Sequence, residues 1–440
     1  MQSSNPAVSV KKPSPRWSVP WHMFASREFR LLETGQLVSG LGTWMTRIAV
    51  AWLIVRITNS VLWLGVIGFT GQIPVLLLAP LAGSAIDRWG TRNTLLVTQV
   101  FASIQAFTLA YFAFSQHISF AHLVVLSVVR GCISAFDIPA RTALVPVLAA
   151  NPKDQSGMLA LDSVVVNLCR VAGPSLAGLL LARFGEAICF LIDGGSYAAS
   201  LAALLMIRER GSAPASTNHA CSWREGWTWL GRYPKAKSSL IMLCITSLIV
   251  LPFTVLLPFH VKNVLQTGPQ TLGALGAVSS VAAIIASCII ASLCNSGSKI
   301  AISYAGMIGA GIALIGLSLS DSLVGTFVAV FVVSFSIMIQ AAATNVYIQS
   351  VTTDRLRGRI TAFYSAAFWG VVPLGSLLLG AFAFFMGSSA AFASGGVLCL
   401  WGALAVGIHF RSYTQRTVSK ESEEATQSIA LELSVSENRS

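Results

Sequence analysis

Long apolar runs separated by short polar segments fill most of the chain. A transmembrane helix needs about 20 mainly apolar residues, and the sequence predicts twelve such helices. They lie at residues 31–55, 62–86, 94–114, 121–145, 159–182, 187–207, 238–260, 271–294, 300–319, 322–349, 360–386 and 388–410. Strands of membrane barrels alternate in polarity and run only about 10 residues, so the pattern favours helices. We therefore predict an all-α membrane protein with twelve transmembrane helices.

The composition supports lipid as the main surrounding medium. Of the 440 residues, 54% are hydrophobic and only 10% are charged, against about 25% charged in a typical soluble protein. So few charges cannot cover a water-facing surface, which excludes a soluble enzyme, a nucleic-acid-binding domain and a disordered chain. The eight cysteines show no C-x-x-C spacing, so neither a disulfide framework nor a metal site is expected.

The net charge of +12 follows the predicted topology. Of the 29 Lys and Arg residues, 23 fall on the side that holds both chain ends, and only Arg56, Arg183 and Lys262 fall on the other. Loops rich in Lys and Arg stay in the cytoplasm. We therefore expect a multi-pass protein of the bacterial inner membrane, the cell membrane, with both termini in the cytoplasm and no nucleic-acid partner.

A polar central segment divides the predicted helices into two groups of six. The expected order is a cytoplasmic N-terminal tail, an N-terminal half, a cytoplasmic central loop, a C-terminal half and a disordered cytoplasmic tail. Their bounds are 1–30, 31–207, 208–237, 238–410 and 411–440.

Glycines repeat between the two halves, at offsets of 208 and 202 residues. The matched pairs are Gly65 with Gly273, Gly68 with Gly276, Gly173 with Gly375, and Gly178 with Gly380. Matching landmarks indicate two pseudo-symmetric six-helix halves, related by an axis along the membrane normal. Halves of this kind can rock around a site at their interface.

The loop after the second predicted helix has a distinctive pattern. It reads G-x-x-x-D-R-x-G-x-R, formed by Gly83, Asp87, Arg88, Gly90 and Arg92. The pattern and its position resemble the signature loop of the major facilitator superfamily, which implies a transporter with that fold. We expect Gly83 to let two helices approach closely and Asp87 to face the positive end of a helix. With the arginines paired to acids or helix C-termini, the loop would latch a cytoplasmic gate.

The fifth predicted helix carries Gly173, Pro174 and Gly178. The segment resembles the G-P-x-x-x-G motif that the superfamily associates with antiporters. Proline lacks the backbone N–H that a helix interior uses, so a helix kink is expected here. The sequence departs from the motif at Cys169 and Ala177, where glycine is expected, and a packing kink without a coupling role is the alternative.

The fourth predicted helix carries Asp137 and Arg141, which are four residues apart and can pair on one helix face. The surrounding stretch, together with Gly42-Thr43-Trp44 and Arg357-Gly358-Arg359, resembles one branch of the superfamily. That branch includes the enterobactin exporter and macrolide efflux pumps. It has an acid where Thr43 stands in this chain.

Charged side chains inside the predicted helices are functional hypotheses, because each costs about 2.5–3.5 kcal/mol on insertion scales. The residues predicted to line a cavity for proton coupling and substrate are Arg47, Arg130, Asp137, Arg170 and Asp193. Asp137 and Asp193 are the predicted proton carriers, and a static Arg–Asp network is the alternative. The cytoplasmic gate is predicted to include, beside the loop pattern, Arg141, Asp162, Arg357 and Arg359.

These features together predict a secondary transporter and not an enzyme. The chain has no Walker loop G-x-x-x-x-G-K-[ST], which would bind ATP, and no cofactor is expected. We predict that a monomer in the lipid bilayer exports a small molecule, such as a siderophore, a drug or a related metabolite. Export would proceed by alternating access with proton antiport. The alternatives are an importer of a small organic solute with the same fold and a transporter-like membrane sensor.

Overall fold

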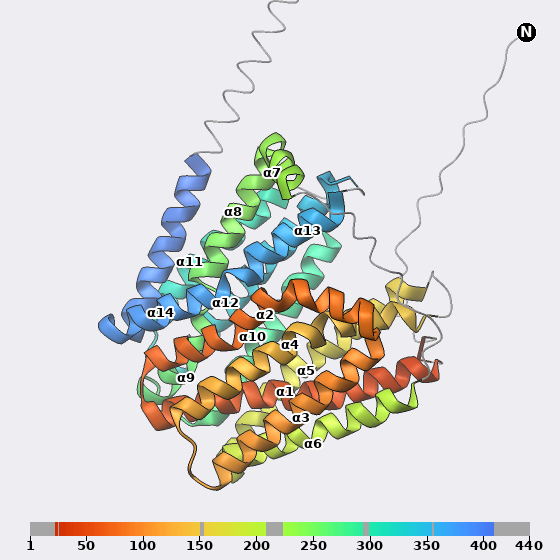
Figure 1. Ribbon diagram of the computed structural model, residues 1–440. Helices are drawn as coiled ribbons and strands as arrows, with labels where there is room; N and C mark the ends of the chain where they lie inside the picture. The colour runs from red at the N-terminus through yellow and green to blue at the C-terminus, as the bar shows by residue number, and fades with distance from the viewer. Residues whose placement is uncertain are drawn as a thin grey trace, which may run out of the picture.

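A computed structural model describes residues 23–24, 26–149, 154–207, 223–293, 299–353 and 356–408. Within them, twelve helical spans are long and apolar enough to cross a membrane, which confirms the predicted number. The spans form two groups of six, one from each half of the chain (Figure 1). The predicted disordered tail at 411–440 lies outside the described residues.

The N-terminal half consists of α1 (Arg27–Thr58), α2 (Val61–Trp89), α3 (Thr91–Phe114), α4 (Phe120–Val147), α5 (Gln155–Phe184) and α6 (Glu186–Met206). The side chain of Ser26 caps α1 by accepting a hydrogen bond from the backbone N–H of Phe29 at 3.4 Å, so α1 starts about one turn earlier than predicted. Gly90 and Gly185 separate consecutive helices at φ angles of 82° and 77°. Glycine adopts this conformation without steric cost, which lets the chain turn without a longer loop.

The C-terminal half consists of α8 (Pro234–Ile249), α9 (Phe253–Asn263), α10 (Pro269–Ser292), α11 (Lys299–Ser318), α12 (Leu323–Val351), α13 (Arg357–Ser365), α14 (Val372–Met386) and a last helix, Ser388–Ile408. Two spans predicted as single runs are interrupted. Pro252 separates α8 from α9, and a π-helical turn, Ala366–Gly370, separates α13 from α14 just before Pro373. Proline removes a backbone donor and so breaks the helical hydrogen-bond ladder.

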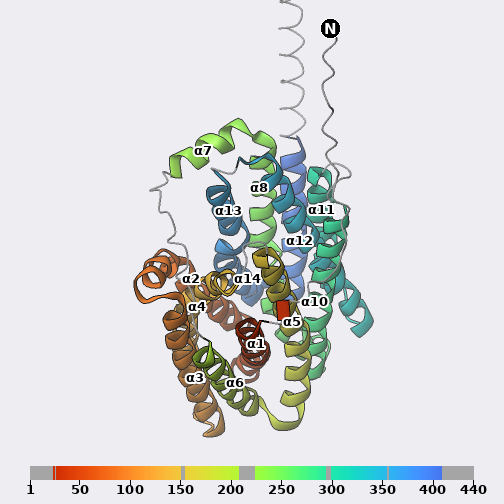
Figure 2. The same cartoon turned by 90° about the vertical axis from the view of Figure 1, so that its right-hand side faces the viewer.

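The predicted central loop contains a helix that the hydropathy pattern does not show. This is α7 (Trp223–Arg232), which precedes α8. Glu225 of α7 forms an ion pair with Arg359 of α13, so α7 is tied to the C-terminal half. In Figures 1 and 2, α7 lies at one end of the helices of this half.

Two helix crossings join the halves: α5 packs against α10, and α2 packs against α14. Both crossings are made by glycines. A Cβ on Gly273 would clash with the carbonyl oxygen of Pro174 and lie 2.9 Å from the Cα of Gly178. A Cβ on Gly65 would lie 3.1 Å from the Cα of Gly380. The glycines that repeat in the sequence therefore form a pseudo-symmetric pair of backbone-to-backbone contacts.

The crossings lie toward one end of the bundle. We use the name terminal face for the end of the bundle at which α1 begins, and the name far face for the opposite end. At the far face, the Nζ of Lys262 donates to the carbonyl oxygen of Val55 at 3.1 Å, and the Nδ2 of Asn263 donates to the Oδ1 of Asn59 at 3.4 Å. From this side the two groups of helices diverge toward the terminal face, where α7 and the start of α1 lie far apart (Figure 1). The halves are joined at one end and spread at the other.

Candidate functional site

Asp193 lies at a close approach of α1 to α6. The residue is only 2% exposed. A Cβ on Gly42 of α1 would lie 2.7 Å from the Oδ1 of Asp193 and 2.6 Å from the Oγ of Ser196, so glycine at position 42 makes room for the acid. The Oδ1 atom is buried and has no hydrogen-bond partner among the described residues. Asp193 is therefore a buried carboxyl group that its surroundings leave partly unsatisfied.

Arg130 of α4 reaches the same region and ties three helices together. Its Nη1 donates to the hydroxyl of Tyr197 at 2.6 Å, and its Nη2 donates to the Oγ1 of Thr43 at 3.3 Å. The two hydroxyls are 2.9 Å apart. Thr43 thus accepts a hydrogen bond from Arg130. At this position, the branch of the superfamily that the sequence resembles has an acid. Asp193 and Asp137 are the acidic neighbours of Arg130, so the structure brings these predicted residues together.

Asp137 of α4 has a full set of partners. Its Oδ1 accepts hydrogen bonds from the Oγ1 of Thr98 at 2.9 Å and the Nε2 of Gln99 at 2.7 Å. Its Oδ2 forms the predicted ion pair with Arg141 at 3.6 Å. A carboxylate held by three partners suits a structural role better than a carboxylate with a free oxygen. Of the two predicted proton carriers, Asp193 has the geometry that fits the role.

Arg47 and Arg170 lie beside one aromatic ring. Their guanidinium carbons are 4.5 Å and 5.4 Å from the centre of the Trp44 ring. Trp44 itself fits closely against α5, because a Cβ on Gly173 would lie 2.5 Å from the Trp44 Cβ. All three interior arginines therefore belong to the N-terminal half.

Glu33 is an interior acid that the sequence prediction omits. It is 2% exposed, and both of its carboxylate oxygens are buried without a hydrogen-bond partner among the described residues. Asp162 of α5 and Arg141 of α4 are its charged neighbours. Glu33 lies near the start of the first apolar run, whereas the predicted interior charges lie deeper in their helices. The sequence signal for such a residue is an acidic side chain at any position within a predicted transmembrane helix.

The signature loop differs from its prediction at the first glycine. Gly83 is exposed, and a Cβ placed on it meets nothing within 4 Å, so no close helix approach occurs there in this conformation. The Nε of Arg92 donates to the carbonyl oxygen of Leu204 at 2.8 Å, and its Nη2 to that of Leu205 at 3.2 Å. Both carbonyls lie in the last turn of α6, so Arg92 contacts a helix C-terminus. The contact joins α3 to α6 within one half and does not bridge the halves.

The remaining predicted gate residues are dispersed in this conformation. Asp87 and Arg88 are exposed. Arg359 pairs with Glu225 within the C-terminal half, while Asp162 lies near Glu33 in the N-terminal half. In this spread arrangement the described gate residues form no single cluster, so the latch stays a prediction.

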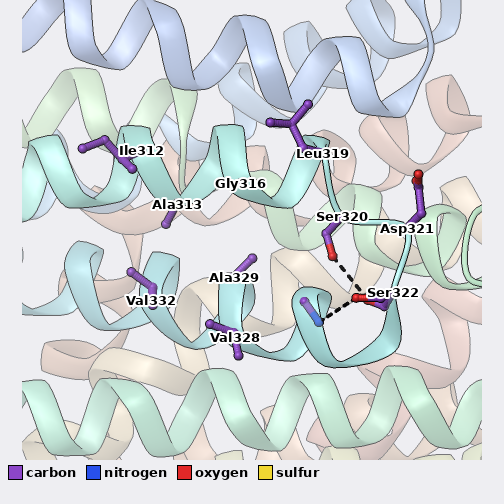
Figure 3. A pocket seen from close by; sticks show the side chains of 11 residues that line it. Ile312, Ala313, Gly316, Leu319, Ser320, Asp321, Ser322, Val328, Ala329 and Val332 are labelled. Carbon is purple, nitrogen blue, oxygen red and sulfur yellow. Dashed lines mark hydrogen bonds between the residues drawn. The ribbon is translucent and has the colours of Figure 1, made fainter.

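The cavity in Figure 3 is a different feature from the charged interior. It has a volume of about 730 Å³ and lies between α11 and α12. Its lining is mainly apolar, and Asp321 is its one charged lining residue. Beside Asp321, the side chain of Ser322 accepts a hydrogen bond from the backbone N–H of Gly325 at 3.1 Å. None of the interior arginines or carboxylates lines it, so we do not assign it to transport.

Twelve helices in two pseudo-symmetric halves, with charged side chains inside, define a major facilitator transporter. The chain belongs to the family of these transporters described as transmembrane secretion effectors, whose model matches residues 18–440. Both the family and the fold are those of transporters and not of enzymes.

Similar proteins carry transport names. The chain is 24% identical over 344 residues to the staphyloferrin A transporter of Staphylococcus aureus, covering 77% of this chain and 85% of the relative. It is 22% identical over 374 residues to the multidrug efflux pump Tap of Mycolicibacterium fortuitum, covering 82% of this chain and 90% of the relative.

Solved structures show the same fold. A bacterial homologue of the human lysosomal transporter Spinster, in an inward-facing and occupied conformation, superposes with a TM-score of 0.69 at 14% identity. The match covers 90% of this chain and 98% of that one. A bacterial homologue of the iron transporter ferroportin, also inward-facing, gives 0.64 at 17% identity, covering 86% and 98%.

Proposed function

We propose that the protein exports a small organic molecule from the cytoplasm of a bacterium by alternating access, driven by proton antiport. The observation that carries the proposal is Asp193, a buried carboxyl group with an unpaired oxygen beside Arg130. The names of the relatives support siderophores and drugs as classes of cargo.

The orientation follows from the distribution of charge. In the predicted topology, 23 of the 29 Lys and Arg residues fall on the side where the first helix begins. The positive-inside rule assigns that side, the terminal face, to the cytoplasm. The far face, closed by the two glycine crossings, then faces outward. Under this orientation the spread terminal face would open to the cytoplasm, and cargo would enter from there.

Asp193 can couple a proton to the cargo because Arg130 is a charged neighbour. When Asp193 is ionised, its negative charge compensates the positive charge of the Arg130 guanidinium. When Asp193 binds a proton, Arg130 loses that compensation. We propose that a proton on Asp193 and a bound cargo molecule exclude each other. The entry of a proton would then be coupled to the exit of a cargo molecule, as antiport requires.

A deletion strain provides the first test. We expect the strain to secrete less of at least one metabolite than its parent, or to become more sensitive to at least one drug, and the intact gene should restore the parent's behaviour. A variant carrying Asp193→Asn should not restore it. The matched control is Asp321→Asn, since Asp321 is an exposed acid at the far end of α11 and α12. No difference between the deletion strain and its parent would contradict export.

Reconstituted vesicles test the coupling directly. With the compound identified by the deletion strain, the wild-type protein should accumulate it against its gradient only when a pH gradient is imposed. Asp193→Asn should remove the dependence on the pH gradient while leaving the protein folded. If this variant kept full proton dependence, Asp193 would not be the proton carrier.

A further inference from the structure

Arg47 of α1 and Arg170 of α5 form a cluster around Trp44 that the proton-coupling scheme does not use. We call the two residues the arginine pair. Their guanidinium carbons lie 4.5 Å and 5.4 Å from the centre of the Trp44 ring. The distance between the two carbons therefore cannot exceed the sum of these two distances. Both sit near the middle of long transmembrane helices. A single small ligand can therefore reach both.

The arginine pair has no acidic partner among the described residues. The Nε of Arg170 is buried and has no hydrogen-bond acceptor. The charged neighbours of Arg47 are two further arginines, Arg170 and Arg130. The nearby acids have other partners, because Asp137 pairs with Arg141 and Asp193 adjoins Arg130. The cluster thus carries uncompensated positive charge.

Arg47 is exposed although its helix is enclosed by protein on most sides. In Figure 2, α1 runs among α2, α4, α5 and α6, and on its remaining side it contacts α9 and α10 of the C-terminal half. Arg47 is nevertheless exposed. A helix enclosed by protein on these sides can expose a mid-membrane residue only to the interior opening. Water and cargo that enter from the terminal face can reach this side chain.

The chemistry of arginine limits what such a cluster can bind. A guanidinium stays charged in proteins, and a charge inside the membrane must be paired or hydrated. Its planar fork of N–H donors fits a carboxylate or a phosphate with two parallel hydrogen bonds. The Trp44 ring attracts both guanidinium groups through cation–π contacts.

We propose that the arginine pair binds the carboxylate groups of the cargo, so that the protein carries an organic polyanion. This inference rests on the proposed transport function and gives the cargo its chemical class. The anion neutralises Arg47 and Arg170 while it is bound, and Trp44 holds the guanidinium groups at a fixed separation. A neutral or cationic compound of the same size lacks the charge to do this.

Binding to the purified full-length protein in detergent tests the proposal without any transport step. Citrate, a small tricarboxylate, is the probe, and its neutral triethyl ester is the control. By isothermal titration calorimetry we expect saturable citrate binding that weakens as salt is added, and no binding of the ester. Citrate that fails to bind, or an ester that binds as tightly as citrate, overturns the proposal.

Variants assign the binding to the arginine pair. Arg47→Gln and Arg170→Gln should each weaken citrate binding about tenfold or more, since each removes charged hydrogen bonds to the ligand. Arg47→Lys keeps the charge and should lose less. Arg183→Gln is the matched control, because Arg183 is exposed at the outer end of α5, and it should bind citrate as the wild type does. Thermal unfolding of each variant checks that it is folded. Unchanged citrate affinity in both folded glutamine variants overturns the proposal.

The two proposals can fail separately. If citrate binds through the arginine pair but no compound is exported in a proton-dependent manner, the binding site stands and the antiport function falls. If Asp193→Asn abolishes export while both arginine variants bind citrate normally, the antiport function stands and the polyanion assignment falls.

Discussion

The two halves of the molecule share a scaffold but differ in chemistry. The crossing of α5 with α10 repeats in the crossing of α2 with α14, glycine for glycine. Yet Arg47, Arg130 and Arg170, with Glu33, Asp137 and Asp193, all lie in the N-terminal half. The described interior of the C-terminal half offers neutral groups, such as Gln340, which is fully buried with both amide atoms unpaired, and the hydrogen-bonded pair Ser303 and Thr344.

Under the proposed transport function, the repeat would supply the motion, and the departure from the repeat would supply the recognition of cargo. A pair of matched crossings lets two rigid bodies rock about a common line. Charges placed in only one body stay together while the other body moves. Substitutions in each region should separate the two properties.

The largest effect is expected for Arg130→Gln. The substitution leaves Asp193 buried without its charged neighbour and removes the hydrogen bonds to Tyr197 and Thr43. Removing one partner of a buried charged network costs about 3–5 kcal/mol, so thermal unfolding should occur at a clearly lower temperature and transport should be lost. An unfolding temperature equal to that of the wild type would show that the network adds no stability.

A bulky side chain at the α5–α10 crossing should affect motion more than recognition. Gly273→Leu places atoms against Pro174 and Gly178, and overpacking of this kind costs about 1–3 kcal/mol. We expect the far face to open, measured as a longer distance between spin labels at positions 59 and 263. Gly316→Leu is the control, since a Cβ on Gly316 meets nothing within 4 Å. A far face that stays closed in Gly273→Leu would break the link between the repeat and the motion.

Glu33→Met should raise stability. Both oxygens of Glu33 are buried without hydrogen-bond partners, and a polar group in that condition costs about 1–3 kcal/mol. Methionine has a similar volume and no such requirement. Thermal unfolding of the variant should therefore shift upward. A downward shift would mean that Glu33 makes a stabilising interaction with Arg141.

The smallest effect is expected for Arg92→Gln. The loss of hydrogen bonds to the carbonyls of Leu204 and Leu205 should cost about 1 kcal/mol, because the site is partly exposed and water replaces part of the interaction. Thermal unfolding measures the difference. Arg88→Gln, at an exposed neighbour in the same loop, should change stability by less.

Hydropathy alone predicted the number of transmembrane spans, because each needs a long apolar run whatever its neighbours are. The repeated glycines and the pair of Asp137 with Arg141 were also visible, since their spacing is a property of the chain. The partners Thr98, Gln99 and Tyr197 were not, because they come from other helices and no local pattern records which faces meet. The π-helical turn at Ala366–Gly370 could not be predicted, because an apolar sequence has the same hydropathy in α- and π-helical geometry.

The glycine crossings have a consequence for the environment in which the protein works. A seal made of backbone against backbone contains no group that gains or loses a proton between acidic and alkaline conditions, and no ion pair for dissolved salt to weaken. Under the proposed orientation this seal faces the medium outside the cell, which a bacterium cannot regulate. The two crossings at the outward side are therefore insensitive to the acidity and the salt content of that medium.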